Sequence, residues 1–191
     1  MTVRVMLVAP ALGAEGRGAR FGDDLPLTDA DLAPARTLAV PRADRVLSAP
    51  SPRCRQSAGA LDLMPADEPC LADLDPGAWR GRPLAELAAA EPESIAAWLS
   101  DPGFAPPGGE SVGALLARVG GWLDALPADT GRVLAVAEPA VVRAAVVHAL
   151  ALPPAAFWRL DVAPLTVTSL SGRAARWNLR CGAPLMPRQL P

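Results

Sequence analysis

The sequence is poor in the residues that hold metals or cross-link small domains. Its 191 residues include one histidine and three cysteines, Cys54, Cys70 and Cys181, at unrelated spacings. A closed zinc site needs four such ligands, so this composition argues against one. An odd number of scattered thiols also argues against a disulfide framework. We therefore expect no metal, no cofactor and a reducing cytoplasm as the setting.

Long apolar runs and basic blocks are also missing. No stretch reaches the ~18 apolar residues of a membrane span, and the formal net charge is −2. We therefore expect neither a membrane nor a nucleic-acid partner. Met1–Ala14 has an apolar stretch that a short signal peptide would also have. Because Arg4 is its only basic residue and Pro10 interrupts it, we interpret the segment as a buried strand that ends in a loop.

What is present is enough apolar sequence for a full core. Hydrophobic residues make up 51% of the chain and charged residues 20%, which suits one domain over residues 1–191. Short apolar segments alternate with helical patterns, as in parallel sheets covered by helices. We predict a three-layer α/β/α sandwich with a mainly parallel central sheet. The predicted strands are Val3–Val8, Arg45–Ser48 and Val133–Ala137, followed by a C-terminal antiparallel hairpin of Leu165–Leu170 and Ala174–Leu179 around Ser171–Gly172.

Local signals predict where the helices begin. Thr28 and Ser51 suit the N-cap position, and Pro52 suits the first turn that follows Ser51. Periodic apolar residues indicate the helices farther along the chain. These are two short helices within 83–99, separated by Pro92, and longer ones over Glu110–Leu126 and Pro139–Leu150.

Three predicted strands end in short polar or proline-containing segments. These ends are Ala9–Pro10, Ser48–Pro50 and Ala137–Pro139. In parallel sheets ligands bind at the carboxyl ends of the strands. We therefore expect the functional site at this edge.

Four segments at or near these ends together form a sequence pattern that is typical of one protein family. They are Ser48–Ala58, Leu71–Gly81, Pro106–Ser111 and Gly131–Ala144. In this order the chain resembles the histidine phosphatase (phosphoglycerate mutase-like) superfamily from about Val3 to Arg180. In its compact length and its segment Pro106–Ser111, the chain resembles the small bacterial branch of this family that includes α-ribazole and broad-specificity phosphatases. In the family, a histidine after the first strand is phosphorylated, and a second histidine ends a later strand. Arginines clamp the phosphate, and an acidic residue protonates the leaving oxygen.

The chain departs from the family where the chemistry lies. By resemblance, the first Arg-His pair falls on Ala9 and Pro10, and the second histidine and its glycine fall on Glu138 and Pro139. Proline has no nucleophile and no backbone N–H. We therefore expect no catalytic residue by the family mechanism.

Other positions match the family pattern. Arg53 matches a phosphate-clamping arginine of the family, Asp73 matches the acid, and Glu110 and Ser111 match the family's Gly-Gly-Glu-Ser segment. Arg20 falls in a segment that borders substrate in the family. The resemblance thus implies Arg53, Arg20, Glu110 and Ser111 as ligand-binding residues. Asp73 stays open between an acid and a turn former.

Charge balance predicts that Glu138 pairs with Arg53. Two unit charges about 4 Å apart interact by about 4 kcal/mol at an effective dielectric constant of ~20. Glu138 would therefore oppose a phosphate as strongly as Arg53 attracts it. An unpaired arginine at the bottom of a pocket would be costly. We expect the Glu138 carboxylate to stand where a phosphate would bind. By the same resemblance, Arg143, in the predicted helix that follows Glu138, matches an arginine of the family.

The single histidine has a structural interpretation. His148 lies ten residues past the third strand end, about 15 Å along a helix at ~1.5 Å per residue. It shares a helix face with apolar residues, which predicts a packed helix histidine. Trp79 and Trp98 sit at positions that fill the core or line the cleft, and of the two we favour the core. We place Cys54 beneath its helix.

Three functions remain open. The first is an inactive phosphatase-like protein (a pseudoenzyme) that binds a small molecule in the altered pocket, or a protein partner. The second is an enzyme that uses Glu138 and Asp73 as acid and base on a non-phosphate substrate. The third is weak residual hydrolysis of a phosphate held by Arg53. A homodimer through the last hairpin is a further alternative.

Overall fold

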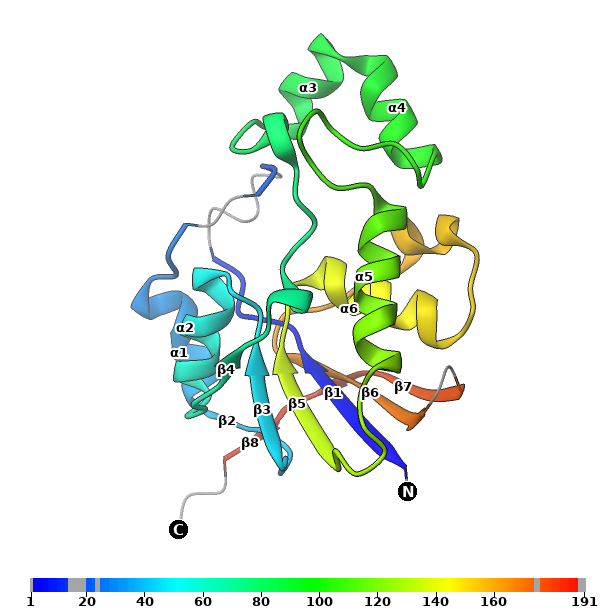
Figure 1. The fold of residues 1–191 in the computed structure, drawn as a ribbon. Coiled ribbons are helices and arrows are strands. Elements are labelled where there is room, and N and C mark those ends of the chain that lie inside the picture. The colour runs from blue at the N-terminus through cyan, green and yellow to red at the C-terminus, as the bar shows by residue number, and fades with distance from the viewer. Residues whose placement is uncertain (1, 14–19, 23–24, 174–175, 189–191) are drawn as a thin grey trace.

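The structure is a computed structural model and describes residues 2–13, 20–22, 25–173 and 176–188. Its central sheet has six strands in the order β4-β3-β5-β1-β6-β7 (Figure 1). The first four are parallel to one another, and β6 and β7 are antiparallel to their neighbours. The strands are β1 (Val3–Val8), β3 (Arg45–Ser48), β4 (Ala66–Asp67), β5 (Arg132–Val136), β6 (Thr166–Arg173) and β7 (Arg176–Pro184). A separate two-stranded sheet pairs β2 (Leu38–Ala39) with β8 (Met186–Pro187).

Helices lie around this sheet, so the predicted α/β fold with a mainly parallel sheet is confirmed. The central strands β1 and β5 are almost wholly apolar and buried, as expected of strands covered on both faces. The α-helices are α1 (Asp29–Arg36), α2 (Pro52–Ala60), α3 (Leu84–Ala90), α4 (Pro92–Ser100), α5 (Val112–Asp124) and α6 (Pro139–Ala149). The described residues also include the short 3₁₀ helices η2 (Pro69–Leu71), η3 (Gly77–Trp79) and η4 (Pro154–Arg159). Within the described residues, no helix has both the length and the apolar character to cross a membrane.

The predicted capping residues start their helices. Thr28 accepts a hydrogen bond from the Asp31 backbone, and the Asp31 carboxylate accepts one from the Thr28 backbone, which makes a capping box. Ser51 Oγ accepts a hydrogen bond from the Cys54 N–H at 3.1 Å. The hydrogen bond between Ser51 and Cys54 fixes the first turn of α2, where Arg53 and Cys54 lie.

The C-terminal hairpin is confirmed, but the turn predicted at Ser171–Gly172 is wrong. Both residues lie inside β6, where Gly172 faces Trp177 of β7. A Cβ atom on Gly172 would lie 2.0 Å from the Arg176 carbonyl oxygen. The glycine therefore allows a close approach of two strands instead of forming a turn. Residues 174 and 175, where the second strand was predicted to begin, lie outside the described residues.

A small helical unit stands away from the sheet, above its carboxyl edge (Figure 1). We call η3, α3 and α4 the cap. Its buried residues, Trp79, Leu87 and Ile95, form a cluster separate from the main core. Trp79 is 1% exposed, which confirms its predicted core position. The cap thus brings aromatic side chains over the edge where the strands end.

Candidate functional site

The segment after β1 is closed by backbone and side-chain hydrogen bonds. Ala9 donates its N–H to the Thr166 carbonyl at 3.0 Å, and its own carbonyl accepts from Leu165 N–H at 3.1 Å. Pro10 is buried, and the Ala11 N–H donates to Ser57 Oγ at 2.9 Å. At Pro10, the strand tip therefore presents neither a nucleophile nor a backbone donor.

Glu138 follows β5 and precedes Pro139, the first residue of α6. Its side chain is 3% exposed. Arg53, in the first turn of α2, donates from Nε to Glu138 Oε1 at 3.3 Å and from Nη2 to Oε2. The predicted pair between Glu138 and Arg53 is confirmed. Two parallel donors of one guanidinium face two oxygens of one carboxylate, the geometry with which arginine also binds phosphate.

Two further side chains complete what we call the Arg53–Glu138 cluster, defined as Ser51, Arg53, Cys54 and Glu138. Ser51 Oγ donates to Glu138 Oε1 at 2.7 Å while it caps α2. Cys54 Sγ lies 3.4 Å from the same oxygen. Cys54 is buried beneath α2 as predicted, but its contact with Glu138 was not foreseen. Among the described residues, the carboxylate is thus held by the N-cap and the first turn of α2.

The electrostatics of the cluster favour a charged pair. Burial by itself lowers the pKa of Arg53, but the hydrogen bond to Glu138 and its charge outweigh burial and raise that pKa. Burial, together with the charge of Glu138, raises the pKa of the Cys54 thiol well above its ordinary value. The thiol therefore stays neutral at physiological pH. A phosphate could reach the Arg53 fork only by displacing the Glu138 carboxylate.

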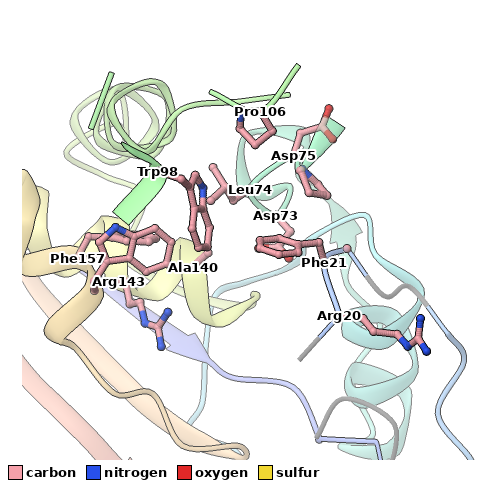
Figure 2. A pocket seen from close by; sticks show the side chains of 13 residues that line it. Arg20, Phe21, Asp73, Leu74, Asp75, Trp98, Pro106, Ala140, Arg143 and Phe157 are labelled. Atoms are coloured by element: carbon pink, nitrogen blue, oxygen red, sulfur yellow. The ribbon is translucent and has the colours of Figure 1, made fainter. Parts of the chain in front are cut away.

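A cavity of about 270 Å³ lies between the cap, α6 and η4 (Figure 2). Four aromatic side chains form much of its wall. Trp98 of α4 faces Trp158 of η4 with ring centroids 4.2 Å apart, and Phe157 packs edge-on against Trp158 at 4.8 Å. Phe21 lies 5.2 Å from Trp98. Trp98 packs, partly buried, against the cluster of Trp79, Leu87 and Ile95 and also lines the cavity, so its predicted core position is confirmed only in part.

The lining residues are Arg20, Phe21, Gly22, Asp73, Leu74, Asp75, Pro76, Trp98, Pro106, Ala140, Arg143, Phe157 and Trp158.

Arg143 is the basic residue that α6 contributes to this wall. Its Nε donates to the Leu160 carbonyl at 2.7 Å, and its guanidinium carbon lies 5.9 Å from the centroid of the Phe157 ring. Among the described residues it forms no ion pair with a carboxylate. Burial lowers the pKa of Arg143, and the negative charges of Asp161 and Asp73 offset only part of that effect. Within the part of the chain that the structure describes, this partly desolvated cation therefore has a carbonyl and an aromatic ring as its contacts.

The two acidic residues that line the cavity, Asp75 and Asp73, have different electrostatic surroundings. Asp75 Oδ1 accepts hydrogen bonds from the Gly77 N–H at 3.0 Å and from Arg80 at 2.7 Å. Asp73 also lines the cavity, and its charge acts to raise the pKa of both Arg53 and Arg143, although burial keeps the net shift of Arg143 downward. The negative charge of Asp73 therefore acts on both arginines, Arg53 and Arg143.

The remaining predicted ligand residues fall in two places. Arg20 lies at the cavity margin, where its Nη1 donates to the Gly81 carbonyl at 3.0 Å. Figure 2 shows its guanidinium pointing away from Trp98. Glu110 pairs with Arg118 at 2.7 Å, and Ser111 caps α5. Ligand contacts by these residues stay predictions, and the structure brings only Arg20 to the cavity.

His148 packs between helices, as its position in the sequence predicted. Its Nε2 lies 3.0 Å from Asp124 Oδ2 of α5. Its ring occupies the space over Gly120, where a Cβ atom would lie 2.3 Å from Nδ1. A glycine in the middle of α5 is thus explained by the imidazole that packs on it. Within the described ranges, no three His, Cys, Asp or Glu side chains gather as metal ligands would.

Comparison with known proteins yields one family model, described as the histidine phosphatase superfamily (branch 1), that matches residues 12–182. A bifunctional protein of Mycobacterium tuberculosis is 45% identical over 60 residues, which are 31% of this chain and 16% of that protein. The chain therefore matches only a small part of that relative's length.

Solved structures share the fold over nearly the whole chain. A putative alpha-ribazole-5'-P phosphatase from Escherichia coli has a TM-score of 0.82 at 21% identity, over 97% of this chain and 99% of that one. A mycobacterial glucosyl-3-phosphoglycerate phosphatase in complex with VO3 has a TM-score of 0.79 at 24% identity, over 95% and 98%. At these identities the likeness supports the fold and says nothing about the substrate.

Proposed function

Because the chain belongs to the histidine phosphatase superfamily (branch 1), we propose that it is a member that no longer hydrolyses phosphate esters and instead binds a ligand. The observation that carries this proposal is the Glu138 carboxylate in the guanidinium fork of Arg53. The ligand site is the neighbouring cavity, which the Arg53–Glu138 cluster does not line.

Electrostatics support the loss of phosphate binding. A phosphate ester carries a charge of about −1.5 to −2 at neutral pH. At about 4 Å from Glu138, each unit of that charge would be repelled by about 4 kcal/mol at an effective dielectric constant of ~20. Attraction by Arg53 would do no more than cancel this repulsion. The Arg53–Glu138 cluster therefore exerts no net electrostatic attraction on a phosphate.

The absence of a nucleophile supports the loss of turnover. Pro10 stands where the resemblance would place the phosphorylated histidine, and it is buried without a reactive group. The one imidazole of the chain, His148, is packed against α5 beside Asp124. The thiol of Cys54 is buried with a raised pKa, so it is a poor nucleophile in this setting.

The alternative functions find less support. An acid and base pair of Glu138 and Asp73 would need both carboxyl groups to face a substrate. Glu138 is 2% exposed and does not line the cavity, whereas Asp73 does. Residual hydrolysis of a phosphate on Arg53 would first require Glu138 to leave. Four further expectations remain predictions: a protein partner, a homodimer, a single domain over residues 1–191 and a cytoplasmic setting.

The test is the turnover of 4-nitrophenyl phosphate by the purified chain and by the variant Arg53→Met. We expect no turnover above background for either protein. The variant separates a true activity from a contaminating phosphatase, since only a true activity at this site depends on Arg53. Turnover by the unmodified chain that disappears in Arg53→Met would contradict the proposal.

A further inference from the structure

A groove on one face of the sheet, between its antiparallel strands and the β2–β8 sheet, shares no lining residue with the cavity beneath the cap. We call it the β6 groove and define it by Arg4, Met6, Val167, Ser169, Ser171 and Arg180. Its volume of about 430 Å³ lies within the range of ~300–1,000 Å³ typical of ligand sites. We propose that it binds the anion of a medium-chain fatty acid, whose carboxylate pairs with Arg4 and Arg180 and whose chain covers Met6.

The register of the strands brings the polar side chains of the groove together. Arg4 of β1 lies opposite Ser171 of β6, and Arg180 of β7 lies opposite Ser169 of β6. Residues opposite each other in a ladder, and residues two apart in one strand, point to the same face of a sheet. The two arginines therefore flank β6 on one face, with two hydroxyls between them. An anion over β6 can accept hydrogen bonds from both sides.

The charges around the groove favour an anion. Within the part of the chain that the structure describes, neither of these two guanidiniums has an ion pair or a hydrogen bond, and none of the lining residues is acidic. The neighbouring Arg132 of β5 is paired with Asp44, and Arg188 is paired with Asp62. Arg42, which follows β2, is a further exposed cation. A carboxylate placed here gains charge-assisted hydrogen bonds from the two arginines.

The other half of the groove is apolar. Met6 and Val167 form its floor and are only 4% and 7% exposed, whereas Met186 of β8 stands at its rim with 69% of its surface exposed. Covering this surface with an acyl chain removes apolar area from water on both partners. Ser171 at the polar end and Val167 at the apolar end are four residues apart in β6, which is about 13 Å at ~3.3 Å per residue. A ligand with an anionic head and a chain of medium length matches this change from polar to apolar.

The test is calorimetric titration of the full chain with octanoate, butanoate and octylamine. Butanoate keeps the carboxylate and lacks four methylene groups, whereas octylamine keeps the chain and carries a positive charge at neutral pH. We expect octanoate to bind at least about tenfold more tightly than either, since only octanoate matches both halves of the groove. Octylamine or butanoate that binds as tightly as octanoate would overturn the proposal, and so would the absence of octanoate binding.

Variants locate the site. The double variant Arg4→Met/Arg180→Met should weaken octanoate at least about fivefold, because both cations are lost. Ser169→Trp places a ring in the middle of the groove without removing either arginine, and it should abolish octanoate binding. Arg36→Met, which removes an exposed arginine of α1 that pairs with Asp29, is the matched control and should change nothing. Unchanged octanoate binding in Ser169→Trp would overturn the proposal.

A second copy of this chain is the alternative occupant of the groove. Sedimentation of the unmodified chain and of Ser169→Trp at the same concentration distinguishes the two occupants. We expect the same mass for both proteins, because a fatty-acid anion leaves the oligomeric state unchanged. A dimer of the unmodified chain that Ser169→Trp dissociates would show that a second copy covers the groove, and it would overturn the proposal.

Discussion

Two arginines at one edge of the sheet have opposite surroundings. Arg53 of α2 faces a buried carboxylate, whereas Arg143 of α6 faces a carbonyl and an aromatic ring. Burial lowers the pKa of both, yet the net shift is upward for Arg53 and downward for Arg143. The comparison shows that the contact with the Glu138 carboxylate, which Arg143 lacks among the described residues, accounts for the opposite directions of the two pKa shifts.

The largest expected contrast concerns access to the Arg53–Glu138 cluster. Cys54 lies inside it, whereas Cys181 is exposed on β7. Because burial and the charge of Glu138 raise the pKa of the Cys54 thiol, we expect it to react with iodoacetamide at least about a thousandfold more slowly than Cys181. Peptide mass spectrometry over a time course at neutral pH measures both rates. Similar rates would mean that the cluster opens readily and would break the comparison.

The next contrast is in stability. Arg53→Met leaves the Glu138 carboxylate buried without its cation, so we expect a loss of about 3–5 kcal/mol in the free energy of unfolding. Urea denaturation followed by tryptophan fluorescence measures this loss. The double variant Arg53→Met/Glu138→Leu should recover at least half of it, because apolar residues of similar volume can replace a buried pair. A loss below about 1 kcal/mol for Arg53→Met would contradict the closed pair.

Removal of the other arginine should cost much less. Arg143→Met gives up one hydrogen bond to the Leu160 carbonyl and a contact with the Phe157 ring. We expect a loss of about 1 kcal/mol in the same urea experiment. A loss equal to that of Arg53→Met would show that the two arginines play the same structural role, against the comparison.

The smallest effect is expected for the exposed ion pair of Arg132 and Asp44, which serves as a surface reference for Arg53 and Arg143. A hydrogen bond from the Arg132 side chain lowers the pKa of Asp44 below its ordinary value of 3.8. Since the folded pKa lies below the unfolded one, the pair contributes to stability above pH 3.8 and loses this contribution as the pH falls through the folded pKa. Arg132→Met should return the pKa part of the way, because the Arg132 backbone still donates to Asp44. NMR titration of the carboxyl group measures it, and an unchanged pKa would contradict the assignment.

The sequence predicts those features that depend on local signals or on strand order. Apolar segments defined β1 and β3, and Thr28 and Ser51 marked the starts of α1 and α2. The pair of Arg53 with Glu138 was predictable because the carboxyl ends of parallel strands meet at one edge. Opposite charges placed there without other partners bind each other.

The remaining features depend on how distant elements meet. The cavity wall combines Phe21, Trp98 and Trp158, which are far apart in the chain and show no local pattern. Trp98 has the periodicity of a core residue in α4, and only the approach of η4 turns it into a cavity wall. Gly172 could not be distinguished from a turn glycine, since its role is a close approach to Arg176 of the next strand.

Binding of vanadate tests most directly whether Glu138 occupies a phosphate site. A related mycobacterial phosphatase was solved in complex with VO3, so vanadate is a suitable probe. Asp67→Ala, which removes the carboxylate paired with the neighbouring Arg55 of α2, is the matched control. Calorimetry should show no vanadate binding by the unmodified chain or by this control, and clear binding by Glu138→Ala. Vanadate binding by the unmodified chain as tight as by Glu138→Ala would contradict the account.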